Sequence, residues 1–462
     1  MTISRYRPTP RGVAASCLLL TVALVAAACG DDPPDDAATT SAATSAAAEP
    51  PASGPDPTAG TDPTTVPSAE STTGTGTAAT GDPTFASLGP IIEQSMQEMA
   101  IPGAIVLVRT PDAEWSQAFG TRRIGEDEPV TTDDHFRIGS NTKTMTGTAL
   151  LQLVDAGEVA LEDPVSKYRP EVPNGDNITV AQLLDMRSGL QSYTVLESFN
   201  QAMDDEPAKA WDPEELAGLG LAEPASFDPG TGFLYSNTNT VLAGLIVEQV
   251  TGMRLEDVLA ENIFGPLGLE NTLLPALTDA SIPEPHPQGY MFGTNVSTIT
   301  PEGVVLPEDE QAEAIAGTLV PTDYTDLNPS WGWAAGAAIS TVGDLATYVE
   351  ALVGGGLLSD DMQQQRLDSV VPVNPDKPQA AGYGLAMARF GTFLGHDGSL
   401  PGFRSFMGHD PATGTTVIVA TTLQAGPAGE QTANELAMAI IAELPAADGT
   451  LTDDTVSPNA EG

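Results

Sequence analysis

The stretch Phe136–Gly157 constrains this chain most, because it predicts a helix that begins at a possible nucleophile. It reads FRIGSNTKTMTGTALLQLVDAG, a pattern that indicates a short extended run, a glycine and then an amphipathic helix. Residues three apart on a helix share a face, so the amine of Lys143 can lie beside the hydroxyl of Ser140. A helix N-terminus also favours developing negative charge. Ser140 could equally be a simple N-cap, and these residues alone leave both interpretations open.

Composition divides the 462 residues into four parts. Residues 1–29 join three arginines to the short apolar run Cys17–Ala28, which is typical of an export signal. Apart from Val66, residues 30–83 contain only Gly, Asp, Glu, Pro, Ala, Thr and Ser, so we expect a disordered tether. Residues 84–445 carry the hydrophobic periodicity of one folded domain, and residues 446–462 form an acidic tail that we also expect to be disordered.

Cys29 follows the small-residue triplet Ala26-Ala27-Ala28, and this resembles a bacterial lipobox. In that case Cys29 is acylated and becomes the mature N-terminus, with the exported domain anchored to the cell membrane by lipid. The alternative is an ordinary signal peptide cleaved near Ala28. In both cases Cys17 leaves with the signal, so the exported domain has no disulfide and depends on its own apolar core.

The charge balance narrows the range of partners. Removing the three arginines of the signal from the 17 basic residues leaves 14, against 63 acidic residues. Such a surface repels nucleic acid, so we expect no nucleic-acid partner. The four histidines are scattered and no HExxH spacing occurs, so the sequence predicts neither a metal site nor a cofactor. It also offers no basis for predicting a protein partner.

The periodicity predicts an α/β (α+β) fold. Helical spacing of apolar residues predicts helices over 85–99, 178–190, 238–250, 255–263, 341–353 and 430–444. Strands are predicted over 104–109, 115–120, 394–398, 402–408 and 415–422, and irregular structure with short strands over 283–329. A hairpin near each end indicates an antiparallel sheet built from both chain ends, with flanking helices and an inserted, mostly helical part. We expect the cleft where these two parts meet.

Two further motifs follow the SxxK of Ser140 and Lys143 in order. Tyr235-Ser236-Asn237 stands just before the predicted helix 238–250, and His396-Asp397-Gly398 lies on a C-terminal strand. Ser140 is the only serine three residues before a lysine, and Tyr235 the only tyrosine two before an asparagine. Each motif is weak alone, but together they resemble the SxxK, YxN and HxG motifs of the penicillin-recognising serine hydrolases. That family includes D-alanyl-D-alanine carboxypeptidases, class C β-lactamases and related esterases.

The flanking sequence extends this resemblance over 85–444, and the family's fold is the β-lactamase/transpeptidase fold. The resemblance implies that Ser140 is the nucleophile, that Lys143 holds it ready, and that Tyr235 relays the proton, where it can act as phenolate. It implies that Asn237 holds the amide of the acyl side chain. The implied oxyanion hole is made by the backbone N–H groups of Ser140 and Ser399.

Three further positions carry expectations about the substrate. His396 is expected to offer a positive or hydrogen-bonding group, although a histidine on a strand is often a packing residue. Gly398 should let an extended substrate approach the strand closely. Trp333 resembles a cleft-wall aromatic of the carboxypeptidase branch, and it is equally suited to filling the core.

The sequence departs from the carboxypeptidase pattern near Tyr383-Gly384-Leu385. Relatives place an arginine soon after this stretch to hold the substrate's terminal carboxylate, where this chain has Ala388. Arg389 is one residue late, and on a strand that shift points it to the opposite face. Arg404, on the neighbouring strand, could take its place. Another departure is Met186, where relatives often have a histidine.

The resemblance therefore implies a serine hydrolase that forms an acyl-enzyme, most simply a D-alanyl-D-alanine carboxypeptidase acting on peptidoglycan stem peptides outside the cytoplasm. One alternative is the same chemistry on a β-lactam, an ester or another amide. Another is a lipoprotein that binds penicillin without hydrolysing it.

Overall fold

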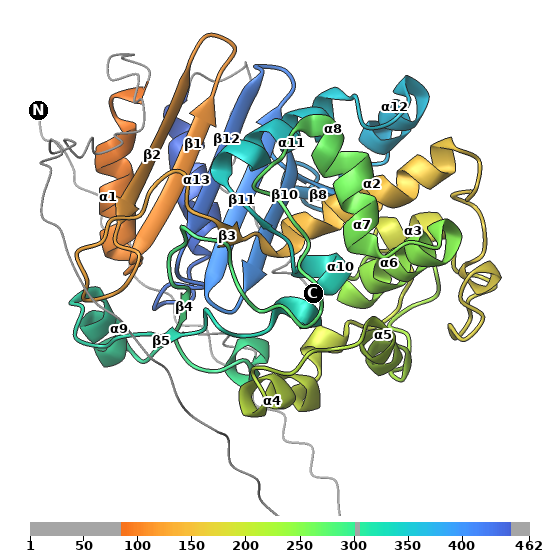
Figure 1. Ribbon diagram of the computed structural model, residues 1–462, viewed down its shortest axis with the longest axis horizontal. Helices are drawn as coiled ribbons and strands as arrows, with labels where there is room; N and C mark the ends of the chain where they lie inside the picture. Colours follow the sequence, from red (N-terminus) through yellow and green to blue (C-terminus); the bar gives the residue numbers. More distant parts are fainter. Residues whose placement is uncertain (1–84, 301–304, 445–462) are drawn as a thin grey trace, which may run out of the picture. The chain divides into compact units, whose positions relative to one another are not determined.

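The computed structural model describes residues 85–300 and 305–444, and the structural statements below concern these residues. Their centre is an eight-stranded antiparallel sheet in the order β2-β1-β12-β11-β10-β9-β8-β7 (Figure 1). The hairpin of β1 (Gly103–Arg109) and β2 (Glu114–Gly120) lies beside the last strand, β12 (Thr415–Thr421). The predicted sheet built from both chain ends is thus confirmed.

Successive side chains of each strand point to opposite faces of the sheet, and both faces are buried. On β1, Ile105 and Leu107 join the larger apolar cluster with the helical insert, whereas Ala104, Val106 and Val108 join the second cluster. Two helices that are distant in sequence cover the second face, α1 (Leu88–Glu98) and α13 (Thr432–Glu443). The first face packs against α11 (Val342–Gly354), and α2 (Thr142–Asp155) belongs to the same apolar cluster. Burial on both faces explains why β12 reads as a continuous apolar run.

The other strands complete the main sheet and form two small ones. The main sheet also contains β7 (Val371–Pro372), β8 (Ala381–Gly384), β9 (Met387–Phe390), β10 (Phe393–Leu400) and β11 (Phe403–Asp410). The small sheets pair β3 (Phe136–Arg137) with β6 (Ile339–Ser340) and β4 (Tyr290–Met291) with β5 (Thr322–Asp323).

Helices make up most of the insert, which lies to one side of the sheet in Figure 1. They are α3 (Val180–Leu184), α4 (Glu197–Asp205), α5 (Pro213–Leu221), α6 (Asn237–Thr251), α7 (Leu255–Leu259), α8 (Gly265–Leu267), α10 (Trp333–Gly336) and α12 (Asp360–Asp368). One further helix, α9 (Glu308–Ile315), lies apart from them, next to β5 (Figure 1).

The helix predicted over 178–190 is much shorter than expected. Thr179 does cap it, accepting from the backbone N–H of Gln182 while the Gln182 side chain returns a bond to the Thr179 N–H. The helix ends at Leu184, and Met186 and Gly189 then take φ values of 62° and 81°. Left-handed residues cannot continue a right-handed helix, so the chain turns towards the site here.

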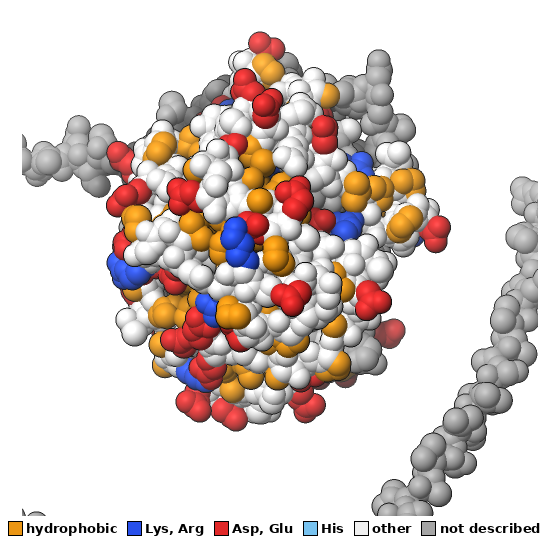
Figure 2. Space-filling model, turned by 90° about the vertical axis from the view of Figure 1, so that its right-hand side faces the viewer, with side chains coloured by type: hydrophobic (Ala, Val, Ile, Leu, Met, Phe, Trp, Pro, Cys, Tyr) orange, Lys and Arg blue, Asp and Glu red, His pale blue; other side chains and the backbone are white. Residues whose placement is uncertain are grey.

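Acidic side chains are scattered over the face shown in Figure 2, with Lys and Arg at a few separate places. Within 85–300 and 305–444, no helix is both long and apolar enough to span a bilayer. Cys29, the predicted signal, the tether and the acidic tail lie outside the described residues.

Candidate active site

Ser140 lies in a single 3-10 turn, Gly139–Asn141, that runs directly into α2. Its hydroxyl is not used as a helix cap, because the residue before α2 is Asn141 and neither turn has a side-chain cap bond. Ser140 is buried but lines a cavity, so its hydroxyl is held by the protein and still reachable by a small molecule. The structure thus puts Ser140 in the position that a nucleophile needs.

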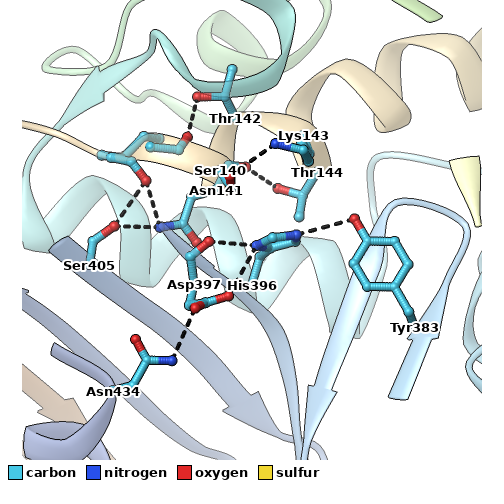
Figure 3. Close-up of polar contacts among 12 residues, drawn as sticks. Ser140, Asn141, Thr142, Lys143, Thr144, Tyr383, His396, Asp397, Ser405 and Asn434 are labelled. Carbon is cyan, nitrogen blue, oxygen red and sulfur yellow. Dashed lines mark hydrogen bonds and ion pairs between the residues drawn. The ribbon is translucent and has the colours of Figure 1, made fainter. Parts of the chain in front are cut away.

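Lys143 is fully buried, one turn further along the same helix. Its Nζ lies 2.9 Å from Ser140 Oγ (Figure 3). The same Nζ lies 2.6 Å from Asn237 Oδ1 and 2.7 Å from the carbonyl oxygen of Ala335. Burial lowers the pKa of Lys143 well below 10.5, although Asp397 attracts the charged form. The carbonyl and the amide oxygen can only accept, so a neutral amine donates its two hydrogens to them. Its lone pair then faces the Ser140 hydroxyl.

Two threonines of α2 place the Ala335 carbonyl. Thr146 Oγ1 donates to the Ala334 carbonyl at 2.7 Å, and the Ala338 N–H donates to Thr142 Oγ1 at 3.1 Å. These two bonds hold the chain before and after Ala335 against α2, the helix that carries Lys143. The acceptor of the amine is therefore fixed by the same element as the amine.

Asn237 begins α6 and lines the cavity. Its Oδ1 accepts from Lys143, while its Nδ2 donates to Thr194 Oγ1 at 2.9 Å and more weakly to Ser192 Oγ at 3.4 Å. This network determines the orientation of the amide. The residue expected to hold the substrate's acyl amide also serves to position Lys143.

Tyr235 lines the same cavity as Ser140, and Lys143 Nζ lies 4.9 Å from the centre of its ring. Burial raises the pKa of the Tyr235 phenol well above 10, and the nearby Ser140 hydroxyl partly opposes this rise. The Tyr235 hydroxyl makes no aligned hydrogen bond among the described residues. The resting form is therefore the phenol. A phenol can donate a proton to a leaving group, and the resemblance also allows it to act as phenolate during the reaction.

Two glycines dock the nucleophile turn onto strand β10. A Cβ on Gly139, which has φ 54°, would lie 2.8 Å from Ser399 N, and a Cβ on Gly398 would lie 2.0 Å from the Ile138 oxygen. The backbone of Ser399 is therefore held against the turn that carries Ser140, as two oxyanion donors require. Gly398 was expected to admit the substrate, but the space beside it is filled by the protein's own Ile138 carbonyl.

His396, on β10, is fully buried and is absent from the described cavity wall. Its Nδ1 lies 2.6 Å from the Asp397 carbonyl oxygen, and its Nε2 lies 3.1 Å from the Tyr383 hydroxyl (Figure 3). An Nδ1–H tautomer donates to the carbonyl and leaves Nε2 to accept from Tyr383. Burial lowers the pKa of His396 to about 4, so the ring is neutral near pH 7. The structure does not bring the expected positive group to the substrate.

The cavity has a volume of about 880 Å³ and is lined from both parts of the domain. The sheet contributes Ser399, Leu400 and Arg404, and the insert contributes Tyr235 and Asn237. Arg404 is the one charged residue among the described lining residues. Most others are uncharged polar side chains, including Gln191, Ser192, Thr194, Asn200, Asn295 and Gln424.

The structure separates the residues that the sequence left ambiguous. Trp333 is a core residue, 3% exposed, whose ring packs against Gly244 of α6; the cavity is lined instead by Trp331. Arg389 is absent from the described cavity wall, and its Nη2 donates to the Pro378 carbonyl oxygen at 2.9 Å. Of the two candidate arginines, only Arg404 reaches the described wall.

Among the residues that the structure describes, no group of three or more His, Cys, Asp or Glu side chains is arranged to hold a metal ion. The groups gathered around Ser140 are an amine, a phenol and neutral amides. Such a set is suited to proton transfer and acyl transfer.

Residues 89–441 match the family model described as beta-lactamase. The chain belongs to the beta-lactamase family. Among curated proteins it is similar to the putative penicillin-binding protein PbpX of Bacillus subtilis, with 26% identity over 338 residues, 72% of this chain and 73% of that protein.

Two solved structures extend the likeness. A D-stereospecific amidohydrolase from a Streptomyces species has 30% identity and a TM-score of 0.63, covering 76% of this chain and 97% of its own. The D-amino acid amidase of Ochrobactrum anthropi SV3, in complex with D-phenylalanine, has 27% identity and a TM-score of 0.64, covering 78% and 99%. This member of the beta-lactamase family is thus a hydrolase of the serine β-lactamase fold.

Sequence analysis missed several residues that shape the site. Ser192 and Thr194 hold Asn237, and Asn434 contacts Arg404 from the last helix. The first two lie just after the predicted helix 178–190, and nothing in their local sequence marked them as partners of Asn237. Asn434 carries no local pattern, because its partners lie on other elements.

Proposed function

We propose that this protein is a serine carboxypeptidase that removes a terminal D-residue from cell-wall peptides of the D-alanyl-D-alanine type, through an acyl-enzyme on Ser140. The observation that carries the proposal is the charge of the cavity wall. In a chain with 63 acidic and 17 basic residues, the single charged residue of the described wall is an arginine, Arg404. A cation in a pocket of neutral groups favours a substrate that carries a carboxylate.

The same observation weighs against a free amine on the substrate. Binding an ammonium group in a partly desolvated site calls for a carboxylate partner, and none lines the described wall. Relatives named as an amidase and an amidohydrolase, both of D-stereospecific or D-amino acid type, support amide cleavage beside a D-residue. The charge of the wall then favours an acid over an amide at the leaving end.

The acylation step follows from the positions of three side chains. Ser140 Oγ attacks the carbonyl carbon and passes its proton to the lone pair of neutral Lys143. The carbonyl π electrons move to the oxygen, where the N–H groups of Ser140 and Ser399 stabilise the oxyanion. The C–N bond then breaks, and the leaving nitrogen takes a proton from the Tyr235 phenol. Lys143 then passes the proton that it took from Ser140 to Tyr235, so the net result is the transfer of one proton from Ser140 to the leaving amine.

Hydrolysis of the acyl-enzyme reverses these roles with water in place of the amine. Water adds to the ester carbon, its proton passes to the Tyr235–Lys143 pair, and Ser140 leaves with a proton restored to its oxygen. The products are an acid and a free D-amino acid. A penicillin also carries a carboxylate, so the same charge favours β-lactams as the second candidate class.

The proposal is tested with the full-length chain on matched substrates. We expect turnover of diacetyl-Lys-D-Ala-D-Ala to exceed that of its C-terminal carboxamide, with nitrocefin, D-phenylalanine amide and p-nitrophenyl acetate as competing classes. Intact mass should show an adduct with a fluorescent penicillin and with a fluorophosphonate. Ser140→Ala should abolish both adducts, whereas Ser226→Ala, at an exposed serine, should keep them. Faster turnover of the amides than of the acid would contradict the proposal.

We also propose that the protein is held at the outer face of the cell membrane by lipid on Cys29, on the basis of the triplet Ala26-Ala27-Ala28 before it. Mass spectrometry of the membrane-bound protein should find an acylated N-terminal Cys29. Release of Cys29→Ala into the soluble fraction, without acyl chains, is the matching control. An unmodified Cys29 would contradict the anchor and leave the enzymatic proposal untouched.

A further inference from the structure

Arg404 is held from behind by the last helix. It lies on β11 opposite Ser399 of β10. Its Nε donates to Asn434 Oδ1 at 3.3 Å, and its Nη1 donates to the Gln424 carbonyl oxygen at 3.2 Å. Both acceptors are neutral, so these bonds set the direction of the guanidinium without cancelling its charge.

Asn434 also contacts the carboxylate in the middle of the HDG motif. Its Nδ2 donates to Asp397 Oδ2 at 3.0 Å (Figure 3). The amide orientation is fixed by this pairing, because a flipped amide would set oxygen against carboxylate and N–H against guanidinium. Asn434 therefore joins a buried anion to a cation in the cavity wall through one neutral group.

The three connected residues, Asp397, Asn434 and Arg404, are all buried. Asp397 is fully buried, and Arg404 and Asn434 are each 8% exposed. Desolvation lowers the pKa of Arg404, while Asp397 and Glu435 attract its charged form. A guanidinium remains protonated under these conditions. The arrangement supplies a compensating charge from behind and leaves Arg404 charged towards the cavity.

We propose that Asn434 is a positioning residue that sets the preference for a carboxylate-bearing substrate, by joining Asp397 to Arg404 as a neutral bridge. The inference rests on the proposed function, because Arg404 is the group that would receive the substrate's carboxylate. A carboxylate at 434 would pair with the guanidinium and cancel its charge. A side chain without an amide would release the guanidinium from its direction.

Two substitutions separate these effects in the full-length chain. Asn434→Ala removes the bridge while favouring the helix, since alanine is the strongest helix former. Asn434→Asp keeps the shape and adds a charge. For diacetyl-Lys-D-Ala-D-Ala we expect kcat/KM to fall about fivefold in the first variant, for the loss of an oriented hydrogen bond. In the second variant we expect a fall of about tenfold, because the new carboxylate offsets the charge of Arg404. For the carboxamide of the same peptide we expect a change within about twofold.

The ratio between the two substrates is the decisive readout, because a residue that only supports the fold would lower both rates together. An equal fall on both substrates, or no fall on the acid, overturns the positioning role. Asn177→Ala, at an exposed loop asparagine, is the matched control and should leave the ratio unchanged.

Arg404→Gln distinguishes failure of this inference from failure of the proposed function. If the parent prefers the acid and Arg404→Gln loses that preference while both Asn434 variants retain it, only the positioning role is overturned. If the parent shows no preference for the acid, the carboxylate assignment is overturned together with the inference. Loss of preference in all three variants supports both.

Discussion

Ser140 and Lys143 come from a single stretch of chain, whereas Arg404, in another part of the cavity wall, is held by residues from two separate segments. On the nucleophile side (Ser140, Lys143, Tyr235 and Asn237) the amine is fully buried and has three partners within 2.9 Å. On the arginine side (Arg404, Gln424 and Asn434) the two contacts of the guanidinium lie at 3.2 and 3.3 Å.

The difference separates chemistry from selectivity. Proton transfer requires short, fixed distances, and adjacent residues of one helix supply them most reliably. Recognition of a charged end group tolerates a looser arrangement, because charge acts over a longer range than a hydrogen bond. Substitutions on the nucleophile side should therefore lower turnover of every substrate. Those on the arginine side should change the ratio of kcat/KM values between carboxylate-bearing and neutral substrates.

The largest effect is expected for Lys143→Met, which keeps the length and apolar stem of the side chain but removes the amine. Acylation by every substrate class should slow by about 1,000-fold, the range seen for loss of a general base. The measurement is the rate of adduct formation with a fluorescent penicillin, with exposed Lys377→Met as the control. If acylation slowed only for substrates that carry a carboxylate, the separate roles assigned to the nucleophile side and the arginine side would be wrong.

Gly398→Ala comes next, because the new methyl group would lie 2.0 Å from the Ile138 carbonyl oxygen and push the nucleophile turn from β10. A shift of this kind near the reacting atoms costs about 100-fold in kcat. Gly343→Ala is the matched control, since a Cβ there meets nothing within 4 Å. Steady-state kinetics on the acid and its carboxamide should show equal losses, and normal kcat in Gly398→Ala would refute the docking role.

Arg404→Gln should change selectivity more than rate. Loss of a charge-assisted hydrogen bond corresponds to about 1.5–3 kcal/mol, or roughly 10- to 150-fold in kcat/KM for the acid. The carboxamide should be affected little, and the ratio of the two values is the measurement. Arg123→Gln, at an exposed arginine, should leave the ratio unchanged. An equal fall in kcat/KM for both substrates would show that Arg404 supports the fold and does not recognise the substrate's carboxylate.

The pH dependence should be set by the nucleophile side. The pKa of Lys143 is lowered, so the active neutral amine is present above that pKa and is lost as pH falls through it. Below it, kcat/KM should fall about tenfold per pH unit for neutral and charged substrates alike. Tyr235 has a raised pKa and should cause no loss until alkaline pH. A pH profile of p-nitrophenyl acetate hydrolysis tests this, and an acid limb unique to carboxylate substrates would contradict it.

The sequence predicts the nucleophile side well for a physical reason. Helical periodicity places Ser140 beside Lys143 whatever the rest of the chain does, and both hairpins of the sheet follow from their period of two. The questions that the sequence left open, and the expectation for Gly398, depend on tertiary packing. Which of Trp331 and Trp333 lines the cavity depends on a short turn, in which Trp333 takes φ 30°. The space beside Gly398 is filled by a carbonyl from a distant segment, so spacing along the strand could not reveal it.

The docking of the nucleophile turn on β10 and β11 has a consequence for how the protein is made. Asn141 donates to Ser405 Oγ at 2.8 Å across a separation of 264 residues. Contacts so distant in sequence form only when nearly the whole domain has been synthesised and has begun to pack. A partly synthesised or unfolded chain therefore carries Ser140 without the backbone N–H of Ser399 that completes the oxyanion hole. We therefore expect the domain to become catalytically competent only once β10 and β11 have formed.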